Sequence, residues 1–200
     1  MMKNEQIDEA VAVLREGGVV AHATDTCYGF ACDAFNQTAL ERLYALKNMP
    51  MSKPVSILVA NFHEAQKYAE FSDEARVLAE RYWPGALTLV LPRKSIVPAF
   101  LNPGVASIGI RVPGHALSLE LAKLFGSPIT TTSANISGLP SPYSIADIQA
   151  QFTHVQLKPD YSLDSGALSA ENLPSTIIDM TGESPVIIRQ GCLVVPGISD

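Results

Sequence analysis

Segments with the apolar spacing of helices alternate with short apolar runs of strand length along this chain of 200 residues. Strands are expected at Val19–Thr24, Val55–Ala60, Ala86–Leu91, Ser107–Val112 and Ile129–Thr132, and again near the tail at Ser175–Met180 and Val186–Arg189. Helices are expected over about 4–16, 36–46, 63–68, 72–83, 116–125 and 144–152. The alternation predicts an α/β fold, and the two adjacent tail strands predict a mixed sheet.

The composition fits one globular domain that spans residues 1–200. With 47% hydrophobic and 17% charged residues, the chain has enough apolar side chains for a sizeable core. No run of about 18 uncharged apolar residues is present, so we expect no membrane span. The acidic residues near the N-terminus are unlike a signal peptide, which needs a basic start. We therefore expect a soluble, cytoplasmic protein. The polar stretch Lys158–Asn172 is expected to be a mobile surface excursion.

Charge and cysteine content exclude several classes of function. The net charge of −6 argues against polynucleotide binding over the whole surface. Locally, Arg93, Lys94, Arg111 and Lys123 outnumber a single acid, Glu120, which predicts a basic groove for a charged small molecule. The three cysteines form no CxxC pair and have no clustered histidines beside them, so no zinc site is expected. Cys27 has no activating base near it in sequence, which disfavours a nucleophile.

The segment Pro128–Pro140 ends a β-branched strand in a loop rich in hydroxyl groups, PITTTSANISGLP. Such a loop presents O–H and N–H groups to phosphate or carboxylate oxygens. Alternatively, its serine and asparagine side chains cap their own turn.

Several segments resemble the blocks of the YrdC/TsaC family, the threonylcarbamoyl-AMP synthases that start a tRNA modification. The segments occur in the family's order: Ala23–Asp33, Leu46–Val59, Trp83–Pro92, Ile108–His115, Pro128–Pro140, Pro174–Met180 and Ile188–Gly191. Seven ordered blocks over nearly the whole chain carry more weight than one short motif.

The resemblance implies an α/β fold with an open, twisted mixed sheet flanked by helices around one concave groove. It implies a nucleotidyltransferase that uses ATP, L-threonine and bicarbonate or CO2 and releases pyrophosphate. Mg²⁺ is expected with ATP, and neither zinc nor flavin. Expected partners are the proteins that carry the adenylate onto tRNA, with a weak direct RNA contact and no membrane.

The resemblance also implies roles for individual residues. The catalytic group is Lys47, Ser133 and Asn135, which also bind nucleotide together with Lys53, Thr131 and Arg189; threonine is held by Thr24, Arg111, Ser175 and Thr176. Without the resemblance, Lys47 would be a residue that neutralises a helix C-terminus. Likewise, Arg111 in an apolar strand is either paired in the core or directed into a pocket.

One departure from the family affects the predicted charge of the groove. Met49 stands where the family has the arginine of its KxR motif, and Lys53 or Arg111 is expected to compensate. Two other readings remain open. The chain can be an RNA-binding module, although the acidic sequence pI of about 5.2 disfavours that. It can also be a paralogue with the same nucleotide pocket and another substrate.

Overall fold

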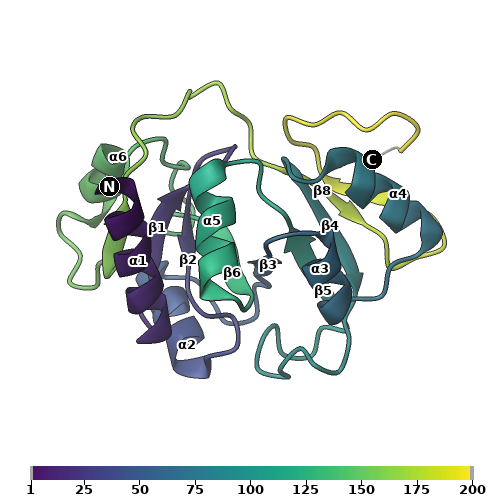
Figure 1. Ribbon diagram of the computed structural model, residues 1–200, viewed down its shortest axis with the longest axis horizontal. Coiled ribbons are helices and arrows are strands. Elements are labelled where there is room, and N and C mark those ends of the chain that lie inside the picture. Colours follow the sequence, from purple (N-terminus) through teal and green to yellow (C-terminus); the bar gives the residue numbers. More distant parts are fainter. Residues whose placement is uncertain (1, 199–200) are drawn as a thin grey trace.

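A nine-stranded mixed sheet forms the centre of the computed structural model, which describes residues 2–198 (Figure 1). The strand order is β7-β1-β2-β6-β3-β5-β4-β8-β9. Strand bounds are β1 Val20–Ala23, β2 Tyr28–Ala31, β3 Ser56–Leu58, β4 Leu87–Pro92, β5 Ser107–Arg111, β6 Ile129–Ser133, β7 Tyr161–Leu163, β8 Thr176–Asp179 and β9 Val186–Arg189. The pairs β1–β7, β3–β5 and β4–β8 are parallel, and the others are antiparallel. The predicted mixed α/β sheet is thus confirmed.

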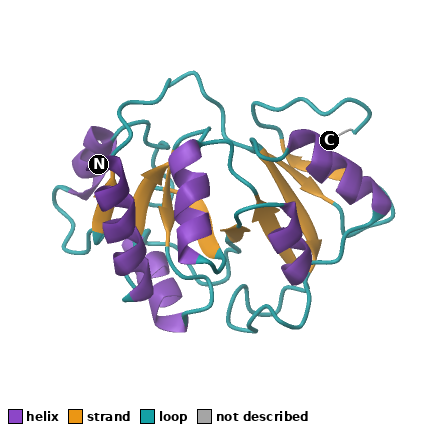
Figure 2. Cartoon of the chain, in the orientation of Figure 1, coloured by secondary structure: helices purple, strands orange, loops and turns teal. Residues whose placement is uncertain are grey.

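Six helices connect and cover these strands (Figure 2). Their bounds are α1 Met2–Arg15, α2 Gln37–Leu46, α3 Phe62–Tyr68, α4 Asp73–Tyr82, α5 Ala116–Phe125 and α6 Ile145–Phe152. Asn36, Ser72 and Ser144 each accept a hydrogen bond from the first turn of the following helix, as N-caps do. Gly126 ends α5 with a φ of 76°, which glycine adopts at little cost.

Apolar residues from the two faces of the sheet form two separate cores. Helices α1 and α5 pack together over Val20, Ala31, Leu58 and Ile129. Helices α2, α3, α4 and α6 belong to the larger core, which holds the alternate strand positions such as Phe30 and Ile57. This alternation is what the two-residue period of a strand requires when both faces are buried. Within residues 2–198, no helix has the length and apolarity to cross a lipid bilayer.

The register places polar positions on the same face as α1 and α5. Leu58 pairs with both Arg111 and Ile129, so these side chains project to one side of the sheet. Further along the same strands, Ser56 pairs with Thr131 and Gly29 pairs with Ser133. The face therefore changes from apolar under the helices to polar beyond them.

Two strands lie outside the sequence-based expectation. The four residues Tyr28–Ala31 form β2 directly after the ATDT turn, and Tyr161–Leu163 form the edge strand β7. The second lies within the stretch that we expected to be a mobile excursion. That expectation was wrong for β7, because this strand pairs with β1. It was also wrong for the residues just after β7, because the Tyr28 hydroxyl donates to the Gly166 carbonyl oxygen at 2.8 Å.

Candidate active site

A groove of about 340 Å³ opens on the polar part of this face. Its walls come from the β1–β2 turn, the β3 approach, β4, β5, the end of β6 and the segment before β8. Among the residues predicted from the sequence, those that line it are Thr24, Lys53, Arg111, Thr131, Ser133, Ser175 and Arg189. The lining contains neither Lys47 nor Asn135 nor Thr176.

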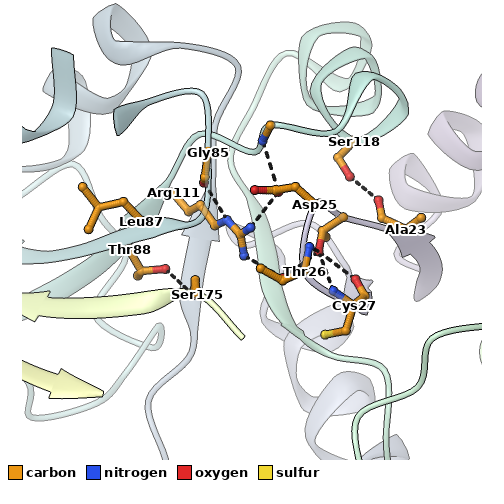
Figure 3. Close-up of polar contacts among 12 residues, drawn as sticks. Ala23, Asp25, Thr26, Cys27, Gly85, Leu87, Thr88, Arg111, Ser118 and Ser175 are labelled. Atoms are coloured by element: carbon orange, nitrogen blue, oxygen red, sulfur yellow. Dashed lines mark hydrogen bonds and ion pairs between the residues drawn. The ribbon is translucent and has the colours of Figure 1, made fainter. Parts of the chain in front are cut away.

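Arg111 is buried at the centre of the groove wall and is held in a fixed plane (Figure 3). Its Nε donates to the carbonyl oxygen of Gly85 at 3.1 Å. One terminal nitrogen donates to Thr26 Oγ1 at 3.2 Å, and the other pairs with Asp25 Oδ1 at 2.6 Å. Each terminal nitrogen therefore keeps one N–H without a partner among residues 2–198.

Arg189 extends from β9 to the same groove. Its guanidinium donates to the main-chain oxygen of Ser175 through Nε at 3.0 Å and to Ser175 Oγ at 2.9 Å. Ser175 Oγ in turn contacts Thr88 Oγ1 at 3.0 Å. Burial, and then the nearby charge of Arg111, lower the pKa of Arg189. Within the described part of the chain it forms no ion pair.

The groove therefore carries more positive than negative charge. Lys53, Arg111 and Arg189 line it, and no aspartate or glutamate from residues 2–198 does. Asp25 touches Arg111 from behind the lining and neutralises part of this charge. Such a surface attracts phosphates and carboxylates.

Lys47 lies beneath the loop that follows β6. It is the C-cap of α2, as predicted, and its side chain is buried. Its ammonium donates to the main-chain oxygen of Ser133, to that of Asn135 at 2.9 Å and to Asn135 Oδ1 at 3.4 Å. Burial, and then repulsion by Lys53, lower the pKa of Lys47 to about 8. The ammonium thus fixes the loop from below, outside the groove lining.

The side chains of the SAN segment mostly support their own loop. Ser133 Oγ lines the groove and donates to Asn135 Oδ1. Asn135 Nδ2 donates to the carbonyl oxygens of Ile136 at 2.9 Å and Leu139 at 2.5 Å. Asn135 therefore caps its own turn, which is the alternative that the sequence left open for this loop.

Two threonines also have local partners. Thr24 Oγ1 donates to the Cys27 carbonyl oxygen at 2.7 Å and accepts from the backbone N–H groups of Thr26 and Cys27. Thr176 Oγ1 donates to the Leu193 carbonyl oxygen at 2.6 Å and accepts from Gly191 N at 3.0 Å. Thr24 therefore shapes the turn at the groove wall, and Thr176 holds the tail.

Sequence reasoning missed several members of the site. Ser56, Thr88 and Ser141 line the groove, but isolated hydroxyl residues give no signal in a single sequence. Asp25 is also absent from the predicted site residues. Its contact with Arg111 joins residues 86 positions apart, which only the fold reveals.

Met49 lies away from the groove. It is 8% exposed, belongs to the larger core and borders a second hollow with Tyr44 and Pro50. The predicted gap in positive charge is therefore not at the groove wall. Lys53 and Arg111, the expected compensating residues, both line the groove.

No cluster of three or more metal-ligating side chains occurs within residues 2–198. Among these residues the groove lining also carries no carboxylate, so the protein offers hydroxyl oxygens but no charged oxygen ligand for Mg²⁺ there.

The fold and the groove together define a class of protein: a mixed α/β sheet with a positively charged groove beside a hydroxyl-rich strand end. Comparison with known families assigns the chain within this class. Residues 12–191 match the Sua5/YciO/YrdC family model, which is described as "Telomere recombination". The chain belongs to this family.

Several curated relatives carry one name, threonylcarbamoyl-AMP synthase. The protein from Pyrococcus abyssi is 37% identical over 94% of this chain, and the chain spans 56% of that relative's length. The Mus musculus protein is 38% identical over 94% of this chain and 68% of its own length. The Klebsiella pneumoniae protein is 34% identical over 95% of this chain and 98% of its own length.

Solved structures agree with this assignment. P. abyssi Sua5 complexed with L-threonine superposes with a TM-score of 0.87 at 38% identity. The match covers 94% of this chain and 54% of the Sua5 chain. E. coli YciO superposes with a TM-score of 0.85 at 26% identity, over 96% and 92% of the two chains. The predicted open YrdC-like sheet is confirmed.

Proposed function

We propose that this chain is a threonylcarbamoyl-AMP synthase. It joins L-threonine, bicarbonate or CO2, and ATP, and releases pyrophosphate and threonylcarbamoyl-AMP, which partner proteins in the cytoplasm transfer to tRNA. The observation that carries the proposal is the groove with Lys53, Arg111 and Arg189 in its lining and no carboxylate among its described residues. Relatives that span nearly the same length carry the same name.

The proposed reaction is a nucleotidyl transfer. The amino group of threonine first takes up CO2 as a carbamate. A carbamate oxygen then attacks the α-phosphorus of ATP, which forms an O–P bond and breaks the bond to pyrophosphate, whose oxygen takes the electron pair. Such a reaction asks the protein mainly for positioning and charge neutralisation.

The groove residues match these tasks. The two free N–H groups of Arg111 suit the planar carboxylate of threonine. Lys53, Thr131 and Ser133 all line the groove, and we place the phosphates of ATP beside them. Arg189 and Ser175 lie beside Arg111 and bind the carbamate or the α-phosphate.

No protein nucleophile is needed. Cys27 lines the groove, but burial raises the pKa of its thiol, so the thiol stays protonated at neutral pH. Magnesium would arrive with ATP, and the hydroxyl groups of the groove would be its protein ligands, since the described lining offers no carboxylate. It would supply charge neutralisation at the phosphates.

A three-substrate assay tests the proposal. Pyrophosphate release is measured with ATP, threonine and bicarbonate, and with each one left out in turn. We expect release only when all three are present. Equal release without threonine contradicts the proposal and favours a paralogue with another substrate. Absence of release together with tight RNA binding favours the RNA-binding module.

A further inference from the structure

Asp25 binds the guanidinium to which the proposed function assigns the carboxylate of threonine. Asp25 Oδ1 pairs with a terminal nitrogen of Arg111 at 2.6 Å, and the same oxygen accepts a hydrogen bond from Gly114 N at 3.1 Å. Figure 3 shows Arg111 between Gly85 on one side and Asp25 with Thr26 on the other. The side chain of Asp25 is 21% exposed, and that of Arg111 is 5% exposed.

The carboxylate of Asp25 contacts Arg111 and the backbone of Gly114. Arg111 and Thr26 line the groove, whereas Asp25 does not. Asp25 is therefore placed to act on a bound substrate through Arg111. We propose that Asp25 is an internal counterion that competes with the substrate carboxylate for Arg111, and so sets the affinity of the amino-acid subsite. This inference rests on the proposed function.

The empty and the occupied groove differ in which carboxylate compensates the charge of Arg111. In the empty groove, Asp25 is the only carboxylate within ion-pair distance of Arg111 among residues 2–198, and Arg189 adds a second positive charge nearby. A buried charge without a partner is costly, so Asp25 stabilises the empty state. In the occupied groove, the substrate carboxylate supplies the same compensation, and two carboxylates that share one guanidinium repel each other. Asp25 thus favours the empty state over the occupied one.

The geometry allows the charge to be removed without loss of hydrogen bonds. Both contacts of Asp25 end on Oδ1, and Oδ2 accepts no hydrogen bond within the described chain. Asp25→Asn keeps an oxygen at that position, so it retains both acceptor contacts and loses only the negative charge. Asp25→Glu keeps the charge, and Asp25→Ser removes it with a smaller acceptor.

A matched control exists at another aspartate–arginine pair. Asp160 Oδ1 lies 2.5 Å from a terminal nitrogen of Arg42, and neither residue lines the groove. Asp160→Asn removes the same charge from a more exposed, two-oxygen pair away from the groove.

The experiment titrates the full chain and its variants with L-threonine, and separately with ATP, in a calorimeter, and records each melting temperature. We expect Asp25→Asn and Asp25→Ser to lower the Kd for threonine at least fivefold and to lower the melting temperature. The Kd of these two variants for ATP should stay within twofold of the wild-type value. The Kd of Asp25→Glu for threonine should stay within threefold of the wild-type value. Asp160→Asn should lower the melting temperature alone.

A structural role for Asp25 predicts a different result, namely lower stability with unchanged or weaker threonine binding. That result in both uncharged variants overturns the inference and leaves the proposed function intact, because the wild type still binds threonine. A wild type that binds no threonine contradicts the proposed function itself, and the inference with it.

Discussion

The ammonium of Lys47 donates a hydrogen bond of 2.9 Å to the main-chain oxygen of Asn135, 88 residues further along the chain. This contact connects the end of α2 to the loop after β6. It gives Lys47 a supporting contact beneath the groove, in addition to the catalytic and nucleotide-binding role that the family resemblance implies. The reverse contact also exists, since Ser137 N donates to the Lys47 carbonyl oxygen at 2.7 Å.

Lys47→Ala should therefore reduce both stability and activity. The buried main-chain oxygens of Ser133 and Asn135 lose their donor, which costs about 2 kcal/mol of the free energy of unfolding. Turnover should fall at least 100-fold because the loop loses its position. Urea unfolding and pyrophosphate release measure the two effects. Lys53→Ala is the control: its exposed side chain lines the groove, so ATP binding should weaken while stability stays nearly unchanged. Equal stability of the Lys47 variant and the wild type would contradict this account.

The low pKa of Lys47 predicts a pH dependence of ATP binding. Its pKa in the folded chain is about 8, against 10.5 for an ordinary lysine. The folded state thus releases this proton first, and from this group alone stability rises with pH between about 8 and 10.5. Over the same range the loop loses its charged donor, so the affinity for ATP should decline above about pH 8.

Lys53→Met provides the diagnostic comparison for that decline. Removal of the like charge raises the pKa of Lys47, and the midpoint of the decline should move to higher pH. The measurement is a calorimetric titration with ATP alone. Threonine is left out because its amino group also ionises in this pH range. An identical midpoint in both proteins would show that Lys47 does not control the loop.

His22 predicts loss of stability in acid. It is fully buried on β1, and burial lowers its pKa to about 4, against 6.5 for an ordinary histidine. Ser118 donates to the Ala23 carbonyl oxygen, so the 3.0 Å contact between Ser118 Oγ and His22 Nδ1 makes Nδ1 the donor. The ring is held neutral, and Nε2 has no partner within residues 2–198.

The unfolded chain takes up the His22 proton first as the pH falls. Stability should therefore drop between about pH 6.5 and 4, by about 2 kcal/mol from pH 7 to pH 5. Urea unfolding at both values measures the drop. His22→Leu should remove most of this slope, and the exposed His154→Gln should leave it in place. A slope that persists in the His22 variant would assign the acid sensitivity to another group.

Gly191 should tolerate no side chain. A Cβ there would lie 2.1 Å from the Pro174 oxygen and 2.5 Å from backbone atoms of Ser175 and Thr176. Gly191→Ala must therefore displace the segment that carries Ser175 into the groove. We expect about 1–3 kcal/mol lower stability and at least tenfold lower turnover. Gly182→Ala is the matched control, since its nearest neighbour would be 3.8 Å away. Wild-type turnover in the Gly191 variant would show that the tail does not position Ser175.

The periodic segments of the chain were predictable because local chemistry determines them. Asn36, Ser72 and Ser144 are strong N-cap residues, and each begins a helix where the sequence placed it. The strand β2 escaped prediction because only four residues, one of them Gly29, form it between a turn and a loop. β7 has three residues and gains its strand conformation from pairing with β1, a contact between distant segments.

Seven of the ten residues predicted from the sequence line the groove, but the contacts of these residues could not be predicted. Burial decides whether a lysine or threonine binds a ligand or supports a loop, and burial depends on the whole fold. Lys47 and Thr176 match the residue types that the family has at these positions. In the structure, however, the Lys47 ammonium donates to the main-chain oxygen of Asn135, and the Thr176 hydroxyl donates to that of Leu193. Asp25 was not among the predicted site residues because its partner, Arg111, lies on a strand far away in sequence.

The most direct test of the proposed activity follows the carbon of bicarbonate into the product. The purified chain is incubated with ATP, L-threonine and ¹³C-labelled bicarbonate, and the adenylates are analysed by mass spectrometry. The account predicts threonylcarbamoyl-AMP that is one mass unit heavier than the unlabelled product and that is absent when threonine is omitted. Formation of an adenylate without the label, or of the same product without threonine, would contradict it.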